Sequence, residues 1–283
     1  ASMRDAIVKN GGNPDLINPE IPVDLVIDHS VQVDVYGTES ALEENIDLEF
    51  QRNNERYEFL KWAEKSFDNY RAVPPATGII HQVNIEFLSD VIIEKDGQLY
   101  PDSMFGTDSH TTTYGCVGAF SSGIGYTEMA SVLGTGKMWV KVPQTIKVTV
   151  NGKLPANVRS KDIILRLIGD LGADGATYQA LEFTGSTIDE MSVASRMTMS
   201  NMAIEAGAKC ALFTPDEKTA EYCNVELTDE LKDLKGDADA VYAREITYNA
   251  EDLVPVLACP SQVDNIKPVT ELAGTAVDQV FIG

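Results

Sequence analysis

The three histidines of this 283-residue chain have residue types and spacing that suit proton transfer. Each follows a short apolar run: Asp28-His29 follows Leu25–Ile27, His81 follows Gly78–Ile80, and Asp108-Ser109-His110 follows Met104–Thr107. Runs of this length are typical of buried strands, and the carboxyl ends of neighbouring parallel strands share the sheet edge where open α/β folds bind ligands. Histidine titrates near neutral pH, and a partnered carboxylate can fix its tautomer. The pattern therefore predicts a shared acid–base site.

Two other interpretations of these histidines stay open. Each histidine alone could be a structural residue with satisfied ring nitrogens. All three together could hold a catalytic zinc ion, because such a site can draw its ligands from distant positions. Phosphate-loop, dinucleotide-binding and serine-hydrolase motifs are incomplete in this chain, so none of those sites is predicted.

A second candidate pair is Asn201 and Glu205. They are four residues apart in a predicted helix over Thr187–Ala206, so they should lie on one helix face. The Glu205 carboxylate could orient a histidine or polarise a substrate group, and the alternative is a surface glutamate at the helix end. The predicted helix boundaries rest on a possible capping box and a C-terminal glycine, which are Thr187 with Glu190 and Gly207.

Strands and helices alternate along the chain, which predicts α/β architecture. Helices are expected over Glu55–Tyr70 and after a Thr214 cap with Pro215 at the first helical position. The alternating run Ile146–Val150 predicts a strand, and Asn151-Gly152 after it predicts a hairpin. We expect three parts: residues 1–142 with the three histidines, residues 143–258 as a second α/β domain, and residues 259–283 as a linker and the first strand of a third domain.

Composition narrows the function classes. The chain has 22 Lys and Arg against 44 Asp and Glu, a formal net charge of −22. This balance opposes binding to nucleic acids or anionic membranes. No apolar run approaches the roughly 20 residues that span a bilayer. The four cysteines lie far apart without a CxxC pair, which suits a reducing compartment, so we expect a cytoplasmic protein.

Three segments strongly resemble the aconitase superfamily, in sequence and in order: Val26–Gln32, Gly78–Gln82 and Gly106–Thr111. Asn54–Pro75 resembles the aconitases proper, and the stretch from Asp174 to Ala208 also resembles the large subunit of isopropylmalate isomerase. The resemblance implies three-layer α/β/α domains, with mixed sheets and helices on both faces. It also implies a hydro-lyase of the tricarboxylic acid cycle that interconverts citrate and isocitrate through cis-aconitate.

In that family a [4Fe–4S] cluster held by three cysteines acts as a Lewis acid. By resemblance, Asp28 and His29 would help the substrate hydroxyl leave as water. His81 and His110 would hold and polarise the water or hydroxyl bound to iron.

The resemblance also implies how this chain would meet its substrate. Asp108, Ser109 and His110 would line the substrate, with Ser109 on a carboxylate. Glu205 would brace His110, and Asn201 would support it.

The sequence departs from the family pattern at the cluster ligands. In the family, the first cluster cysteine follows a strand like Val280–Gly283 and a Cys-x-x-Cys pair comes later, and none of the four cysteines here stands at a ligand position. The family's carboxylate-binding arginines and serine base are also missing. We therefore expect an aconitate hydratase fragment that is inactive alone and binds neither metal nor cluster, because missing C-terminal domains complete the site for citrate, isocitrate and cis-aconitate. The alternatives are a fragment of isopropylmalate or homoaconitate isomerase, and a non-catalytic module that binds a carboxylate or a divalent metal.

Overall fold

The computed structural model describes residues 1–27, 31–74 and 92–280. The chain divides into two compact units, each assembled from two stretches of sequence. The first comprises Ala1–Ser89 with Ile124–Lys141, and the second comprises Asp90–Gly123 with Val142–Gly283. The division expected at residues 142 and 258 stays a prediction.

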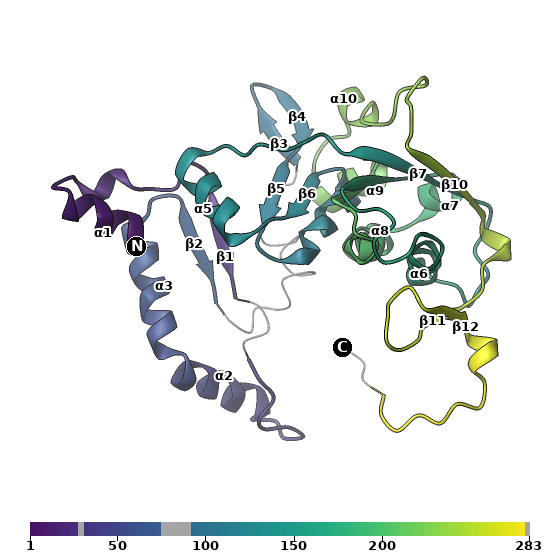
Figure 1. The fold of residues 1–283 in the computed structure, drawn as a ribbon, viewed down its shortest axis with the longest axis horizontal. Helices are drawn as coiled ribbons and strands as arrows, with labels where there is room; N and C mark the ends of the chain where they lie inside the picture. The colour runs from purple at the N-terminus through teal and green to yellow at the C-terminus, as the bar shows by residue number, and fades with distance from the viewer. Residues whose placement is uncertain (28–30, 75–91, 281–283) are drawn as a thin grey trace. The chain divides into compact units, whose positions relative to one another are not determined.

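The first unit contains one parallel pair of strands and several helices. Strand β1 pairs with β2, with Val23 opposite Tyr70 (Figure 1). Its described elements are α1 (Ser2–Lys9), the 3₁₀ helix η1 (Pro14–Leu16), β1 (Val23–Val26), α2 (Ala41–Arg52), α3 (Asn54–Ser66), β2 (Tyr70–Val73) and α5 (Tyr126–Thr135).

The helix predicted over Glu55–Tyr70 is shorter than expected. It ends at Ser66, because Phe67 already has extended backbone and Tyr70 begins β2. The helix also has an exposed aromatic pair, since Phe59 is 51% exposed and stacks on Trp62 at 5.4 Å between ring centroids.

The second unit carries the larger core and the candidate site residues that the structure describes. Its first stretch forms a hairpin of β3 (Ile92–Lys95) and β4 (Gln98–Pro101), then β5 (Ser103–Gly106), the 3₁₀ helix η2 (Ser109–Val117) and β6 (Phe120–Gly123). Strands β5 and β6 pair in parallel. The second stretch contains β7 (Gln144–Asn151), α6 (Ser160–Leu171), β8 (Gln179–Thr184), α7 (Ser186–Glu190), α8 (Val193–Asn201), η3 (Met202–Ala206), β9 (Cys210–Phe213), α9 (Glu217–Cys223), α10 (Asp229–Lys232), β10 (Arg244–Asn249), η4 (Ala250–Asp252), β11 (Val256–Ala258), β12 (Ile266–Pro268) and η5 (Val269–Leu272).

A four-stranded sheet in the order β10-β7-β8-β9 is the centre of this unit. All of its neighbouring strands run parallel, and β7 and β10 lie side by side in Figure 1. The hairpin predicted after Ile146–Val150 is therefore wrong. The Asn151-Gly152 turn instead leads into α6, because parallel neighbours need a crossover rather than a tight turn. The alternating strands and helices confirm the predicted α/β class.

The core forms where α6 and α8 pack on this sheet. On β7, Ile146, Val148 and Val150 are buried while the residues between them are partly exposed, so one face of the strand is buried. Phe183 of β8 stacks on Phe213 of β9 with ring centroids 5.0 Å apart. The buried residues of α6 complete the core, and these are Ile163, Ile164, Leu165, Leu167 and Ile168.

The single helix predicted over Thr187–Ala206 is wrong, because the structure divides this segment into α7, α8 and η3. Met191 has extended backbone, and Ser192 starts α8 anew by accepting the backbone N–H of Ser195. Thr187 forms no capping box, because it lies inside α7, whose N-cap is Gly185; its hydroxyl donates to the Gly152 carbonyl at 2.7 Å. Gly207 does end the segment, in the left-handed conformation at φ +81°.

The helix start predicted at Thr214-Pro215 is shifted by two residues. Asp216 is the N-cap of α9 and accepts the backbone N–H of Thr219 at 3.0 Å, so Pro215 precedes the helix. At the C-terminus, the strand expected at Val280–Gly283 lies outside the described residues except for Val280, which is not in a strand.

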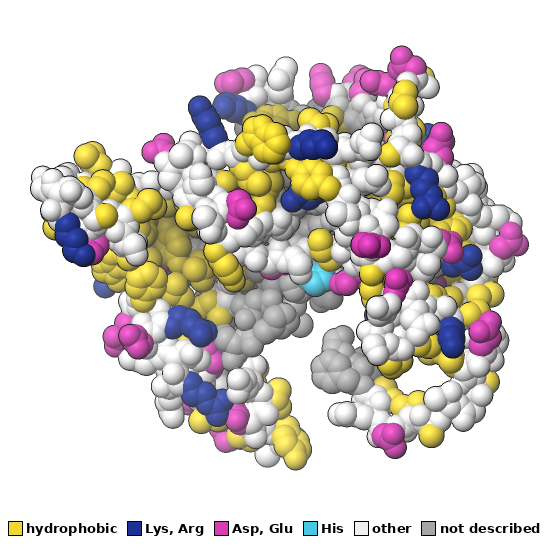
Figure 2. All heavy atoms as spheres, viewed as in Figure 1, with side chains coloured by type: hydrophobic (Ala, Val, Ile, Leu, Met, Phe, Trp, Pro, Cys, Tyr) yellow, Lys and Arg dark blue, Asp and Glu magenta, His cyan; other side chains and the backbone are white. Residues whose placement is uncertain are grey.

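The described surface mixes charges of both signs. Figure 2 shows acidic and basic side chains interspersed over the face that it draws. Within the described ranges, the helices lack the combination of length and apolar character that a bilayer crossing requires.

Candidate functional site

Strand β5 delivers Asp108, Ser109 and His110 to the start of η2. The Asp108 carboxylate caps that helix, because it accepts the backbone N–H of His110 at 2.8 Å and the hydroxyl of Thr111 at 2.5 Å. Gly106 makes this corner possible, since a Cβ there would lie 2.1 Å from Thr111 Oγ1. These local contacts therefore fix the position of the His110 backbone.

The His110 imidazole has a partner at each ring nitrogen. Its Nε2 lies 3.2 Å from Glu205 Oε1, and its Nδ1 lies 3.1 Å from Ser109 Oγ. The side chains of His110 and Glu205 are 28% and 36% exposed, so the pair is reachable from solvent but partly screened. An ionised carboxylate can only accept hydrogen bonds, so this geometry places a proton on Nε2.

Two threonines join η2 to the end of α8. Thr113 Oγ1 donates to the His110 carbonyl at 2.7 Å and accepts from Asn201 Nδ2 at 3.0 Å. Thr112 Oγ1 donates to the Asn201 carbonyl at 3.3 Å. Asn201 is the last residue of α8, and Glu205 lies in η3. Both residues therefore contact η2, but from two separate helices rather than from one continuous helix.

Strand β9 of the central sheet also supports η2. Residues Thr111–Val117 are buried, and a Cβ at Gly115 would lie only 1.7 Å from the Ala211 carbonyl oxygen of β9. Such close backbone approach needs glycine. The helix that carries His110 is therefore packed directly on the sheet.

The structure brings together five of the predicted site residues, which are Asp108, Ser109, His110, Asn201 and Glu205. Asp28, His29 and His81 lie outside the described residues, so their roles stay predictions. The sequence reasoning missed Thr112 and Thr113. The only signal available was their position in a run of three threonines directly after His110.

The model of the Aconitase family (aconitate hydratase) matches residues 1–280 of the chain. The chain belongs to the aconitase family. Aconitate hydratase A of Streptococcus mutans serotype c is 57% identical over 222 residues, which cover 78% of this chain and 25% of that protein. Aconitate hydratase A of Bacillus subtilis is 50% identical over 226 residues, again 78% of this chain and 25% of the relative.

This aconitase-family chain is also similar to a relative whose name gives a different substrate. The probable methanogen homoaconitase large subunit of Methanosarcina mazei is 46% identical over 228 residues, which cover 80% of this chain and 56% of the relative. The chain thus spans about a quarter of the aconitate hydratases named above and just over half of this subunit.

The described cysteines of this aconitase-family chain do not fit an iron–sulfur cluster, whose ligands are converging thiolates. All four are free, and no group of three His, Cys, Asp or Glu side chains in the described ranges could hold a metal ion. Burial raises the pKa of the Cys210 thiol to about 12 and also raises the pKa of the Cys116 thiol, so both are protonated near neutral pH. Among the described residues, the cysteines therefore do not converge on one site.

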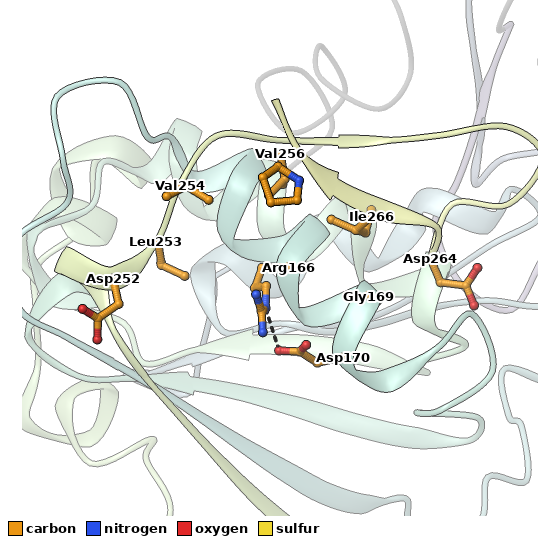
Figure 3. Close-up of a pocket in the computed structure, with 10 residues that line it drawn as sticks. Arg166, Gly169, Asp170, Asp252, Leu253, Val254, Val256, Asp264 and Ile266 are labelled. Carbon is orange, nitrogen blue, oxygen red and sulfur yellow. Dashed lines mark hydrogen bonds and ion pairs between the residues drawn. The ribbon is translucent and has the colours of Figure 1, made fainter. Parts of the chain in front are cut away.

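One described cavity is a separate feature. It has a volume of about 200 Å³ and lies between α6 and the β11–β12 segment (Figure 3). Arg166 pairs there with Asp170, and Asp252 and Asp264 lie toward opposite ends of the view. Its lining includes none of the predicted site residues. We therefore place the candidate site at the start of η2 and not in this cavity.

Proposed function

We propose that this chain supplies acid–base residues of an aconitate hydratase, a hydro-lyase that interconverts citrate and isocitrate by dehydration to cis-aconitate and rehydration. The family match and the names of the most similar relatives support the reaction class. The structural observation that supports it best is the His110 imidazole, held by Glu205 at Nε2 at the exit of a parallel strand. A carboxylate–imidazole pair is a common means of moving a proton at neutral pH.

The pair suggests how His110 and Ser109 work together. Glu205 keeps a proton on Nε2, so in the neutral ring the Nδ1 lone pair accepts the Ser109 hydroxyl. When the ring takes up a second proton, at Nδ1, this hydrogen bond reverses. The Ser109 O–H can then donate to a substrate carboxylate while His110 donates to the oxygen of Ser109. Asp108 holds both residues in place by capping η2.

Further groups complete the proposed site. Asp28 and His29 would assist departure of the hydroxyl as water, and His81 would act with His110 on the bound water. The carboxylate-binding arginines, the base that removes the carbon-bound proton and the cluster would come from the remaining length seen in the relatives. The 283-residue chain alone is therefore proposed to be inactive.

An aconitase assay on this chain beside the complete gene product tests the proposal, with iron and sulfide supplied anaerobically to both. We expect conversion of citrate and isocitrate by the complete product, and neither activity nor cluster absorbance in the 283-residue chain. An inactive complete product overturns the aconitate hydratase proposal. Activity in the 283-residue chain would instead favour metal chemistry at the three histidines.

The Methanosarcina mazei relative supports a second candidate, an isomerase acting on homoaconitate, because that probable homoaconitase subunit is 46% identical over 80% of this chain. The two candidates share a reaction type and differ in substrate. Comparing turnover of citrate and homocitrate by the complete product distinguishes them, since the preferred substrate should have the higher kcat/KM.

A further inference from the structure

The hydroxyl of Thr113 lies between the two halves of the candidate site. It donates to the backbone carbonyl of His110 and accepts from the side-chain amide of Asn201, at 2.7 and 3.0 Å. Thr113 is only 2% exposed, so water does not readily replace either bond. One oxygen therefore satisfies a donor and an acceptor that lie 91 residues apart in sequence (Asn201 minus His110).

These bonds close a ring of contacts around His110. One side of the ring runs from the His110 carbonyl through Thr113 to Asn201, and the other runs from the His110 imidazole to Glu205. Asn201 and Glu205 are joined by the short helix η3, which starts directly after Asn201. Thr112 adds a second bond from η2 to the same end of α8. The position of Glu205 relative to the imidazole therefore depends on how Asn201 is held.

We propose that Thr113 is a positioning residue for the His110–Glu205 pair, and that it acts through its hydroxyl rather than its volume. This inference rests on the proposed function for its catalytic meaning, since Thr113 itself is buried and does not touch the reacting groups. Removing the hydroxyl leaves the Asn201 amide and the His110 carbonyl without this partner. The amide then turns toward another acceptor, η3 shifts with it, and the Nε2 to Oε1 contact lengthens.

Imidazole nitrogen NMR tests this geometry in the 283-residue chain. The chain has only three histidines, and His110→Asn identifies the His110 signals by their loss. In the unaltered chain we expect the Nε2-protonated tautomer to dominate. Thr113→Val, which keeps the shape and loses the hydroxyl, should produce a mixture of both tautomers, and Thr113→Ser should restore the original spectrum.

A matched control separates positioning from general loss of stability. Thr149 and Thr184 share a hydroxyl–hydroxyl bond at 3.1 Å across β7 and β8. Thr149→Val removes a comparable bond and should leave the His110 signals unchanged. If Thr113→Val does not fold, Asn201→Ala removes the same bond from the more exposed partner and should give the same mixed tautomers.

The inference is overturned if the His110 signals of folded Thr113→Val, or of Asn201→Ala in its place, match those of the unaltered chain. Kinetics of the complete gene product then separate this inference from the proposed function. Thr113→Val should lower kcat roughly tenfold with little change in KM, because misplaced catalytic groups mainly reduce turnover. A tautomer change without loss of turnover supports the positioning by Thr113 and contradicts the catalytic role of His110.

Discussion

At the scale of single residues, the imidazole of His110 is oriented by groups of different character. Glu205 is a charged acceptor at Nε2, while Ser109 is a neutral hydroxyl at Nδ1 that can donate or accept. The first partner fixes the tautomer and the second adapts to the protonation state of the ring. This asymmetry gives the ring one nitrogen, Nδ1, at which a proton can be exchanged.

Glu205→Gln tests the charged partner. A glutamine amide can offer either N–H or C=O, so it no longer enforces a proton on Nε2, and we expect kcat of the complete gene product to fall about 10–100-fold. Glu230→Gln, which alters an exposed carboxylate in α10, is the control and should have no effect. Unchanged activity in Glu205→Gln would show that Glu205 is a surface glutamate at a helix end with no role in turnover.

His29→Asn tests the residue proposed to release water. Loss of a general acid or base typically costs about a hundredfold or more in turnover, and we expect that loss in the complete gene product. Circular dichroism should show an intact fold. Near-normal turnover would remove His29 from the mechanism.

At the scale of elements, the 3₁₀ helix η2 is tied to the sheet by backbone contact rather than by large side chains. Gly115 faces the Ala211 carbonyl, and Gly118 continues the chain at φ +91° beside Pro215. A helix held so closely cannot rotate or slide without steric clash. The site residues at the N-terminus of η2 are therefore held rigidly, because η2 is packed on the sheet.

Gly115→Ala should disrupt this docking. Its Cβ would lie 1.7 Å from a backbone oxygen, and we expect the free energy of unfolding to fall by about 3 kcal/mol or more. Gly134→Ala in α5 is the control, since nothing lies within 4 Å of its Cβ position, and it should be neutral or slightly stabilising. Urea unfolding monitored by circular dichroism measures both, and equal stability of the two variants would contradict the close packing.

Local patterns predicted the elements that depend on short-range order. The apolar runs located β1, β5 and β7, and helical periodicity located most of α3. The break between α7 and α8 was missed because Met191 has extended backbone and Ser192 caps a new helix, in the middle of a segment with continuous helical spacing. The Asn151-Gly152 turn was misread because the same dipeptide serves hairpins and crossovers, and only the strand order decides between them.

The candidate site shows the same limit. Asp108, Ser109 and His110 were found because they directly follow an apolar run, and Asn201 and Glu205 were found through their four-residue spacing in a predicted helix. Thr113 gave no signal of its own, since its role depends on an amide 88 residues away.

At the scale of the whole molecule, the net charge of the chain and its length relative to its homologues bear on what it can bind. The formal net charge is −22, and Ser109 is a neutral donor, so the described site offers little attraction to a tricarboxylate. The chain spans about a quarter of the length of the aconitate hydratases described above. We therefore expect the 283-residue chain alone to bind a tricarboxylate weakly.

Calorimetry with citrate tests this expectation on the 283-residue chain. We expect a dissociation constant in or above the millimolar range, about 4 kcal/mol of binding free energy or less. Sodium chloride at equal ionic strength is the control for heats of dilution and screening. Micromolar binding would contradict the expectation and would favour a carboxylate-binding module.

The assembly of the second unit from two separate stretches has a consequence for biosynthesis. Helix η2 docks on Ala211 of β9, and His110 meets Glu205 only 95 residues later in the chain. At ordinary rates of translation, this interval lasts on the order of ten seconds. During that time η2 and its neighbours β5 and β6 have been made, but η3 and β9 have not. The newborn chain must therefore carry the start of η2 without the surface on which it will rest.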